Sequence, residues 1–166
     1  HLLEEDLGLE HSVSVTTRPP RPGEIDGVDY HFVSHEAFDK MVSGGEFLEH
    51  EDNFGKFYGT PKNGVERILK KGRSVLLSID VKGAMRVKKL YPKRCVLIFI
   101  LPPSIKALKK RLHGRKSDKA EDIRRRLKLA RKEMSYKDRY DHRVINDRLD
   151  AAYRRLKNII ITEQDK

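Results

Sequence analysis

The stretch SVLLSIDVKGAMRVKKL, residues 74–90, decides the fold class. Its apolar opening, residues 74–79, is typical of a buried strand. Asp80 follows, and the pattern from Val81–Leu90 predicts a helix that ends before Pro92. A strand that leads directly into a helix is the repeating unit of a parallel sheet covered by helices.

The same alternation continues along the chain in both directions. Further buried strands are predicted at residues 11–16 (HSVSVT), 95–101 (CVLIFIL) and 143–145 (RVI). Helices are predicted at residues 34–43, 61–71, 104–112, 118–136 and 147–161. The expected fold class is therefore α/β, with a mostly parallel sheet and helices on both of its faces.

Residues 27–58 depart from this rhythm. The segments DYHFVS and EFLEHEDNFGKFYGT predict short, curved, partly polar strands joined by glycine turns, which we interpret as a small inserted antiparallel lobe. Ligands of open α/β sheets bind beyond the carboxyl ends of the strands. Residues 16–21, Asp80 and Asn146 each follow such an end, so we expect them to converge.

Composition limits the possible functions. The chain has 166 residues, 36 Lys and Arg against 25 Asp and Glu, and a net charge of +11. This surplus favours a polyanionic partner, either nucleic acid or nucleotides, and charge alone does not choose between them. The single cysteine, Cys95, lies in an apolar run and is expected to be a buried structural thiol. With neither a signal-peptide layout nor a membrane-spanning apolar run, the expected location is the cytoplasm.

The loop TTRPPRPGEIDGVDY, residues 16–30, is the first candidate site. Arg18 and Arg21 carry planar donor forks that match phosphate oxygens, and the prolines around them restrict the backbone before a ligand arrives. Tyr30 could donate a further hydrogen bond to the same phosphate, and Glu24 could hold an arginine in place. The alternative is a proline-stiffened surface loop whose charges are only solvated.

The segment FLEHEDNFGKFYGTP, residues 47–61, is the second candidate site. A carboxylate such as Glu49 that faces the N1–H and exocyclic amine of a purine selects guanine, because adenine would leave buried polar groups unpaired. Thr60 can hydrogen-bond a base edge, and Gly59 allows close approach of the backbone. In the alternative interpretation, Tyr58 is core packing and Glu49 is an edge-strand charge.

These two segments, together with SIDVKGAMRVK, IFILPPS, RLHGR and VINDRLDAAYRRLK, resemble in order and spacing the guanylate kinase family, from about Ser12 to the carboxyl terminus. The resemblance implies the fold of a P-loop nucleoside monophosphate kinase, with an inserted GMP-binding lobe and a helical lid. It implies one domain over residues 1–166, with its core at 1–16 and 74–166, the GMP lobe at about 17–73 and the lid at about 112–128.

The resemblance also implies an activity. The family transfers the γ-phosphoryl group of ATP to GMP and forms GDP and ADP, with Mg²⁺ accompanying ATP. The implied partners are GMP or dGMP and ATP, with no specific nucleic acid, no membrane and no metal site of the protein's own. Phosphoryl transfer is mostly positioning and electrostatic stabilisation, so no protein nucleophile is expected.

The family's functional residues map onto matching positions of this sequence. The implied ligands of the GMP phosphate are Arg18, Arg21, Tyr30 and Tyr58, with Glu24 orienting the arginines. The implied guanine-binding residues are Ser14, Glu49, Thr60 and Asp80, with Gly59 beside them. The implied ATP and lid residues are Arg111, Arg115, Arg126 and Asn146, the last near the adenine. The implied catalytic residues are Arg18, Arg115 and Arg126.

Two departures from the family pattern stand out. The phosphate-binding motif G-x-x-x-x-G-K-[ST] is absent from the sequence, since the one Gly–Lys pair, Gly55–Lys56, has His50 and Phe57 at the other required positions. We therefore expect an N-terminally truncated form that lacks a strand between residues 74–79 and 95–101, and a chain 1–166 without GMP-dependent ATP consumption. Ser78 stands where the family usually has a carboxylate, which bears on Mg²⁺ positioning.

Two other functional classes compete with this interpretation. A guanylate-kinase-like interaction module, which binds phosphopeptides, would need no P-loop, but it would also have no use for Glu49, Thr60, Asp80 and the lid arginines. A basic nucleic-acid binder is the third hypothesis. It is disfavoured because the chain has no tryptophan, no aromatic stacking platform and no base-reading motif.

Overall fold

The computed structural model describes residues 2–5, 7–114 and 120–166. The chain forms two compact units, His1–Lys93 and Arg94–Lys166. Arg115 and part of the expected lid at 112–128 lie outside the described residues. The domain boundaries expected from the sequence remain a prediction.

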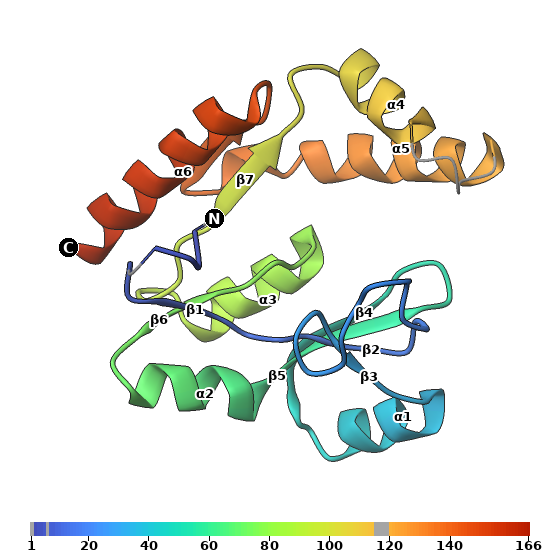
Figure 1. Cartoon of the computed structure of the whole chain (residues 1–166), viewed down its shortest axis with the longest axis vertical. Coiled ribbons are helices and arrows are strands. Elements are labelled where there is room, and N and C mark those ends of the chain that lie inside the picture. The colour runs from blue at the N-terminus through green and yellow to red at the C-terminus, as the bar shows by residue number, and fades with distance from the viewer. Residues whose placement is uncertain (1, 6, 115–119) are drawn as a thin grey trace. The chain divides into compact units, whose positions relative to one another are not determined.

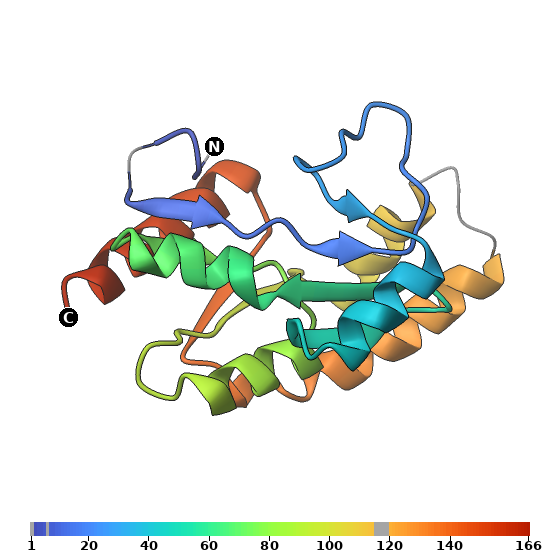
Figure 2. The same cartoon turned by 90° about the horizontal axis from the view of Figure 1, so that it is seen from below.

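The first unit contains a four-stranded sheet in the order β3-β2-β5-β4 (Figure 1). Its strands are β2 (Val15–Thr16), β3 (His31–Phe32), β4 (Phe47–Asp52) and β5 (Phe57–Pro61). β5 runs antiparallel to β4, as the predicted lobe requires. It also runs antiparallel to β2, which the sequence assigned to the core, and β2 and β3 run parallel, which departs from a purely antiparallel lobe. A parallel pair needs a connection of about a dozen residues or more, and the loop 17–30, which projects from the sheet in Figure 2, provides it.

The strand predicted at residues 11–16 is split between two sheets. β1 (Leu9–His11) pairs in parallel with β6 (Ser74–Leu76), whereas Val15 and Thr16 belong to β2. The Ser12 amide still donates to the Leu76 carbonyl at 3.3 Å, and the Ser14 carbonyl accepts from the His31 amide at 2.8 Å. Residues 12–14 therefore carry the chain from one sheet to the other.

Helices of the first unit begin where the sequence predicts. They are α1 (His35–Ser43), α2 (Lys62–Lys70) and α3 (Val81–Leu90). The Ser34 hydroxyl caps α1 by accepting from the Ala37 amide, and the Asp80 carboxylate caps α3 by accepting from the Gly83 amide. A cluster of apolar side chains holds α1 against the four-stranded sheet, built on Val15, Phe38 and Phe47.

The second unit pairs β7 (Ile98–Leu101) in parallel with β8 (His142–Ile145). Its helices are α4 (Ile105–His113), α5 (Ala120–Met134) and α6 (Leu149–Gln164), with a short 3₁₀ turn at Lys137–Arg139. α6 packs on β8, and α4 packs on α5. Among the described residues of this unit, the buried side chains are apolar: Leu97, Leu112, Ile123, Val144, Ala152 and Ile160.

Parallel strand pairs that alternate with helices confirm the predicted α/β class. Among the described residues, β6 pairs with β1 and β7 pairs with β8, so β6 and β7 belong to different sheets. The expectation of a strand between them stays a prediction. In the part of the chain that is described, no helix has both the length and the apolar character needed to cross a membrane.

Candidate functional site

Arg18 and Glu24 form a two-bond ion pair across the loop 17–30. Arg18 Nη1 donates to Glu24 Oε2 at 2.9 Å, and Nη2 donates to Oε1 at 2.8 Å. The Arg21 amide also donates to Glu24 Oε2 at 2.7 Å. The hydrogen bond from Arg18, followed by that from Arg21, lowers the pKa of the Glu24 carboxyl, and Glu24 in turn raises the pKa of the Arg18 guanidinium. Glu24 was predicted to orient an arginine, and in the structure it holds the Arg18 guanidinium. The Arg21 side chain is exposed.

Two threonines anchor the base of this loop to β5, a feature that the sequence reasoning missed. The Thr16 hydroxyl donates to the Phe57 carbonyl at 2.9 Å and accepts from the Arg18 amide at 3.2 Å. The Thr17 hydroxyl accepts from the Phe57 amide at 3.0 Å. Both threonines are buried, so these bonds are shielded from water and fix the backbone that enters Arg18.

Aromatic rings surround the Arg18 guanidinium. Its Cζ lies 5.3 Å from the ring centroid of Tyr30 and 5.7 Å from that of Phe32, within the range of cation–π attraction. The Tyr58 ring meets the Tyr30 ring edge-on at a centroid distance of 6.0 Å, and a hydrogen bond with Tyr58 also raises the pKa of Arg18. Four predicted phosphate-site residues, Arg18, Glu24, Tyr30 and Tyr58, are therefore gathered in one place.

Glu49 and Thr60 form a buried pair across β4 and β5. The Thr60 hydroxyl donates to Glu49 Oε1 at 2.5 Å, and both residues are buried. Burial raises the pKa of the Glu49 carboxyl, and the nearby Asp80 and Glu51 carboxylates raise it further, against the effects of the Thr60 hydrogen bond and of Arg86. Such a carboxylate, held beside Asp80, is suited to accept hydrogen bonds from a ligand that presents N–H groups.

Glu51, two residues beyond Glu49 on β4, is a second feature that the sequence reasoning missed. Its carboxylate meets Lys82 Nζ at 2.8 Å and Arg86 Nη2 at 2.7 Å, and Arg86 Nη1 donates to the His50 carbonyl at 2.6 Å. These contacts fix the first turns of α3 against β4. Acidic residues two apart on a strand and basic residues four apart on a helix each indicate a charged face, but the sequence does not show that these two faces meet.

Gly59 precedes Thr60 on β5, and Ser14 directly precedes Val15, the β2 residue that pairs with Gly59. A Cβ at Gly59 would stand 2.7 Å from the Phe47 ring, so the absence of a side chain there is needed for packing within the lobe. Ser14 is half-buried at the crossing between β1 and β2. The structure thus places Ser14, Gly59, Thr60, Glu49 and Asp80 in the same unit as Arg18.

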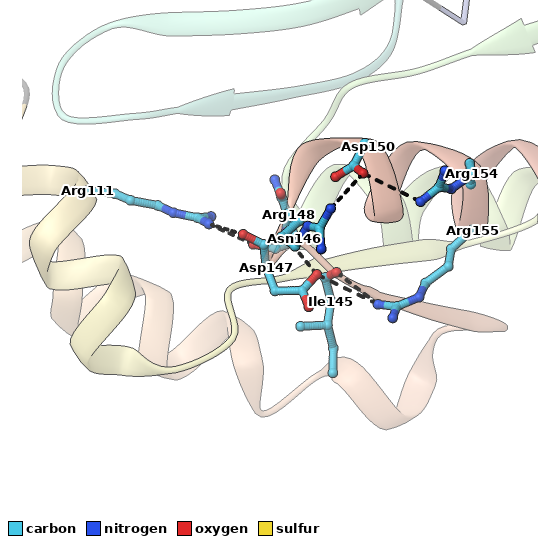
Figure 3. Close-up of polar contacts among 8 residues, drawn as sticks. All are labelled: Arg111, Ile145, Asn146, Asp147, Arg148, Asp150, Arg154 and Arg155. Atoms are coloured by element: carbon cyan, nitrogen blue, oxygen red, sulfur yellow. Dashed lines mark hydrogen bonds and ion pairs between the residues drawn. The ribbon is translucent and has the colours of Figure 1, made fainter.

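The predicted ATP and lid residues belong to the second unit. Arg111, near the end of α4, donates from Nη2 to the Asn146 carbonyl at 2.8 Å and to the Asp147 carbonyl at 3.4 Å (Figure 3). The Asn146 amide donates to the Leu101 carbonyl at 2.7 Å, so α4 and the ends of β7 and β8 are joined here. Arg126 is half-buried on α5, whereas Arg115 lies outside the described residues.

Beside Asn146, charged side chains form surface ion pairs at the start of α6. Asp150 Oδ2 meets Arg148 Nη2 at 3.1 Å and Arg154 Nη2 at 3.4 Å, and Arg155 Nη1 lies 3.8 Å from Asp147 Oδ1 (Figure 3). The backbone amide of Arg148 lowers the pKa of the Asp147 carboxyl. All of these side chains are exposed, so each pair contributes little to stability. Among the described residues, no three His, Cys, Asp or Glu side chains gather as a metal site requires.

Comparison with known proteins identifies the family. The family profile described as Guanylate kinase matches residues 2–163. The chain is 47% identical over 165 residues to the guanylate kinase of Wolbachia pipientis, covering 99% of this chain and 82% of that protein. It is 48% identical over 165 residues to the guanylate kinase of Rhodopseudomonas palustris, covering 99% of this chain and 75% of the relative.

A solved structure agrees with these relatives. The crystal structure of guanylate kinase from Anaplasma phagocytophilum matches with a TM-score of 0.84 and 39% identity, over 99% of this chain and 79% of that one. The matches in sequence and in structure both extend over nearly the whole chain. We conclude that this chain belongs to the guanylate kinase family of nucleoside monophosphate kinases.

Proposed function

We propose that the first unit binds GMP and presents its phosphate as the acceptor of the γ-phosphoryl group of ATP, so that GDP and ADP are formed. The observation that carries this proposal is that one unit contains two polar groups, each already held in place by a neighbouring side chain. One is the Arg18 guanidinium held by Glu24. The other is the buried Glu49 carboxylate held by Thr60.

The donor geometry of Arg18 supports a phosphate ligand. Glu24 and the Pro19 carbonyl use both hydrogens of Nη1 and one of Nη2. A guanidinium has five N–H donors, so the Nε–H and the second Nη2 hydrogen lie outside these bonds. Tyr58 is a further hydrogen-bond partner of Arg18, so a phosphate would share these donors with the Tyr58 hydroxyl. Two adjacent N–H groups match two oxygens of one phosphate. Tyr30 and Tyr58, which flank Arg18, supply hydroxyls for the same phosphate, and Arg21 adds a second cation.

The acidic cluster supports guanine as the base. Guanine offers donors at N1 and at its exocyclic amine, whereas adenine offers an acceptor at N1, which a carboxylate would repel. In this proposal Glu49 and Asp80 accept from the guanine edge, and Ser14, Thr60 and the Gly59 backbone complete the contacts. GMP and dGMP are both proposed as substrates.

The second unit supplies the proposed ATP contacts. Arg111, Arg115 and Arg126 would neutralise the charge that spreads over the phosphates in the transition state, and Asn146 would lie near the adenine. Mg²⁺ enters with ATP as the MgATP substrate and neutralises part of its phosphate charge. Residues 1–166 belong, in this proposal, to one kinase domain in the cytoplasm without a nucleic-acid or membrane partner. Because the sequence contains no G-x-x-x-x-G-K-[ST] motif, residues 1–166 by themselves are expected to bind GMP without consuming ATP.

Calorimetry with GMP and AMP tests this proposal. Both nucleotides share the ribose and the phosphate, so a clear preference of the chain for GMP reports on the base-reading carboxylates. Absence of GMP binding, or equal affinity for AMP, contradicts the proposal.

A phosphopeptide-binding module remains the second candidate, because the sequence contains no G-x-x-x-x-G-K-[ST] motif. A phosphoserine peptide in the same titration distinguishes the two functions. Such a peptide presents a phosphate but no guanine, so it is expected to bind more weakly than GMP. Peptide affinity equal to or above that of GMP would favour the interaction module.

A further inference from the structure

Gly83, the third residue of α3, lies against the Glu49 side chain. A Cβ built on Gly83 would stand 2.9 Å from Glu49 Cδ, 3.2 Å from its Cγ and nearer still to its Oε2. Real Cβ atoms essentially never come closer than 3.0 Å to such neighbours. The Glu49 carboxylate therefore occupies the space that any side chain at position 83 would need.

We infer that Gly83 is a positioning residue that sets the guanine preference by leaving room for the Glu49 carboxylate over the first turn of α3. This inference rests on the proposed function, in which Glu49 reads the guanine edge. Gly83 itself need not touch the nucleotide, because it acts through the place it gives to Glu49.

The ion pairs between α3 and β4 determine which group must yield when position 83 gains a side chain. Glu51 holds Lys82 and Arg86, which flank Gly83 on the same helix, and Arg86 also bonds the His50 carbonyl. The Gly83 amide is itself bonded to Asp80 Oδ1 at 2.8 Å. Withdrawal of the helix would break several of these contacts, so the end of the flexible Glu49 side chain is the group that moves.

Movement of Glu49 would disturb both of its oxygens. Oε1 accepts the Thr60 hydroxyl, and Oε2 lies where the Cβ would stand. Guanine presents two adjacent donors, N1–H and the exocyclic amine. The Glu49 carboxylate must keep its position and its orientation to accept hydrogen bonds from both. The loss of one charge-assisted hydrogen bond corresponds to an affinity decrease of about ten- to a hundredfold.

The test compares Gly83→Ala with a matched control, Gly64→Ala. Gly64 is likewise the third residue of its helix, α2, but its Cβ would meet the nearest atoms, Ser12 Oγ and Pro61 Cγ, at 3.5 and 3.6 Å, which are ordinary contacts. Alanine at either site carries the same gain in helix propensity. The affinities for GMP and AMP are measured by calorimetry, and folding is followed by thermal unfolding.

We expect Gly83→Ala to lower the preference for GMP over AMP by about ten- to a hundredfold, with AMP affinity retained. Gly64→Ala should leave the preference unchanged. An unchanged preference in folded Gly83→Ala, or a parallel loss of GMP and AMP affinity, overturns the inference. If the wild-type chain shows no preference for GMP, the proposed function itself fails, which is a distinguishable result.

A second pair of variants covers the case in which Gly83→Ala does not fold. In a Glu49→Ala background the colliding carboxylate is gone, so adding Gly83→Ala should leave the thermal stability equal or higher and the residual nucleotide preference unchanged. If Gly83→Ala also unfolds the chain in this background, glycine at position 83 is needed for folding even without the Glu49 carboxylate, and the inference is wrong.

Discussion

Arg18 in the first unit and Arg111 in the second are both held by hydrogen bonds, but their acceptors differ in kind. Arg18 is bound at two points by the Glu24 carboxylate, and its side chain is only 13% exposed. Arg111 is exposed and bonds two backbone carbonyls at the end of β8. Arg18 is therefore held by a carboxylate of opposite charge, whereas Arg111 is held by uncharged backbone carbonyls.

The same contrast holds for the groups around them. In the first unit Glu49, Thr60, Thr16 and Thr17 are buried and bonded to one another or to the backbone. In the second unit the ion pairs at the start of α6 are exposed (Figure 3). Side chains that are already held by hydrogen bonds and partly removed from water lose little conformational freedom when a ligand binds. This suits the first unit to the selective recognition that we propose for it. The charged side chains of the second unit at the start of α6 are exposed and therefore less firmly held before a ligand binds.

The largest expected effect comes from Arg18→Ala. This change removes the donors proposed for the phosphate, and two charge-assisted hydrogen bonds at about 1.5 kcal/mol or more each correspond to a loss of GMP affinity of about a hundredfold. The matched control is Arg154→Ala, which removes an exposed arginine paired with Asp150 in the second unit. Calorimetry with GMP checks both. Equal losses in the two variants would contradict the contrast between the units.

The next effect concerns pH and Glu49. Guanine donors require the ionised carboxylate, and burial raises the pKa of Glu49. Below that pKa, GMP affinity should therefore fall with decreasing pH by up to about tenfold per pH unit. AMP carries the same phosphate, so the ratio of GMP to AMP affinity removes the titration of the phosphate. Glu49→Gln should abolish the pH dependence of this ratio, and a dependence that survives in Glu49→Gln would assign it to another group.

Folding stability gives an independent check on Glu49. Because folding raises its pKa, the folded chain keeps a proton at pH values where the unfolded chain has released it. The contribution of Glu49 to the free energy of unfolding is then largest at pH values below the unfolded pKa and decreases as the pH rises through the folded pKa. Denaturant titrations across this range should show the decrease in wild type and a flatter profile in Glu49→Gln.

A smaller effect is expected from Glu24→Gln. The amide keeps the shape of the side chain but loses the charge that pairs with Arg18, so the arginine must be ordered when the ligand binds. Ordering one such side chain corresponds to an affinity decrease of about three- to tenfold. Calorimetry with GMP should show this decrease, and Arg18→Ala combined with Glu24→Gln should be little weaker than Arg18→Ala alone. Fully additive effects of the two changes would mean that Glu24 does not act through Arg18.

The smallest effect is expected at Glu121, which pairs with Arg125 at 2.6 Å on the exposed face of α5. Exposed pairs four residues apart on a helix contribute only about 0.3–0.5 kcal/mol. Glu121→Gln should therefore change the free energy of unfolding by less than about 0.5 kcal/mol and leave GMP affinity unchanged. A larger destabilisation, measured by denaturant titration, would show that ion pairs of the second unit are more than surface contacts.

Much of the fold could be predicted because its signals are local. Ser34, Asp80 and Ser104 cap helices whose starts are encoded within a few residues. The division of residues 11–16 between two sheets could not be predicted, because an apolar run does not show which partner each of its residues will pair with. The loop chemistry predicted that Glu24 holds an arginine, but only the structure shows that this arginine is Arg18.

The contacts of Glu51 with Lys82 and Arg86, and the room that Gly83 leaves for Glu49, could not be predicted. These contacts join residues more than thirty positions apart, and they exist only after α3 has packed on β4. Periodicity and spacing describe single elements, so a contact between two elements is visible only in the folded structure.

NMR spectroscopy shows most directly whether Arg18, Glu49 and their neighbours in the first unit bind GMP. GMP is titrated into the uniformly ¹⁵N-labelled chain, and the shifts of the backbone amides and of the arginine Nε–H groups are followed. We expect shifts at Arg18, around Glu49 and Thr60, and in the first turn of α3, with smaller shifts at Arg111 and Asn146. Shifts concentrated in residues 94–166, or none at all, would contradict this expectation.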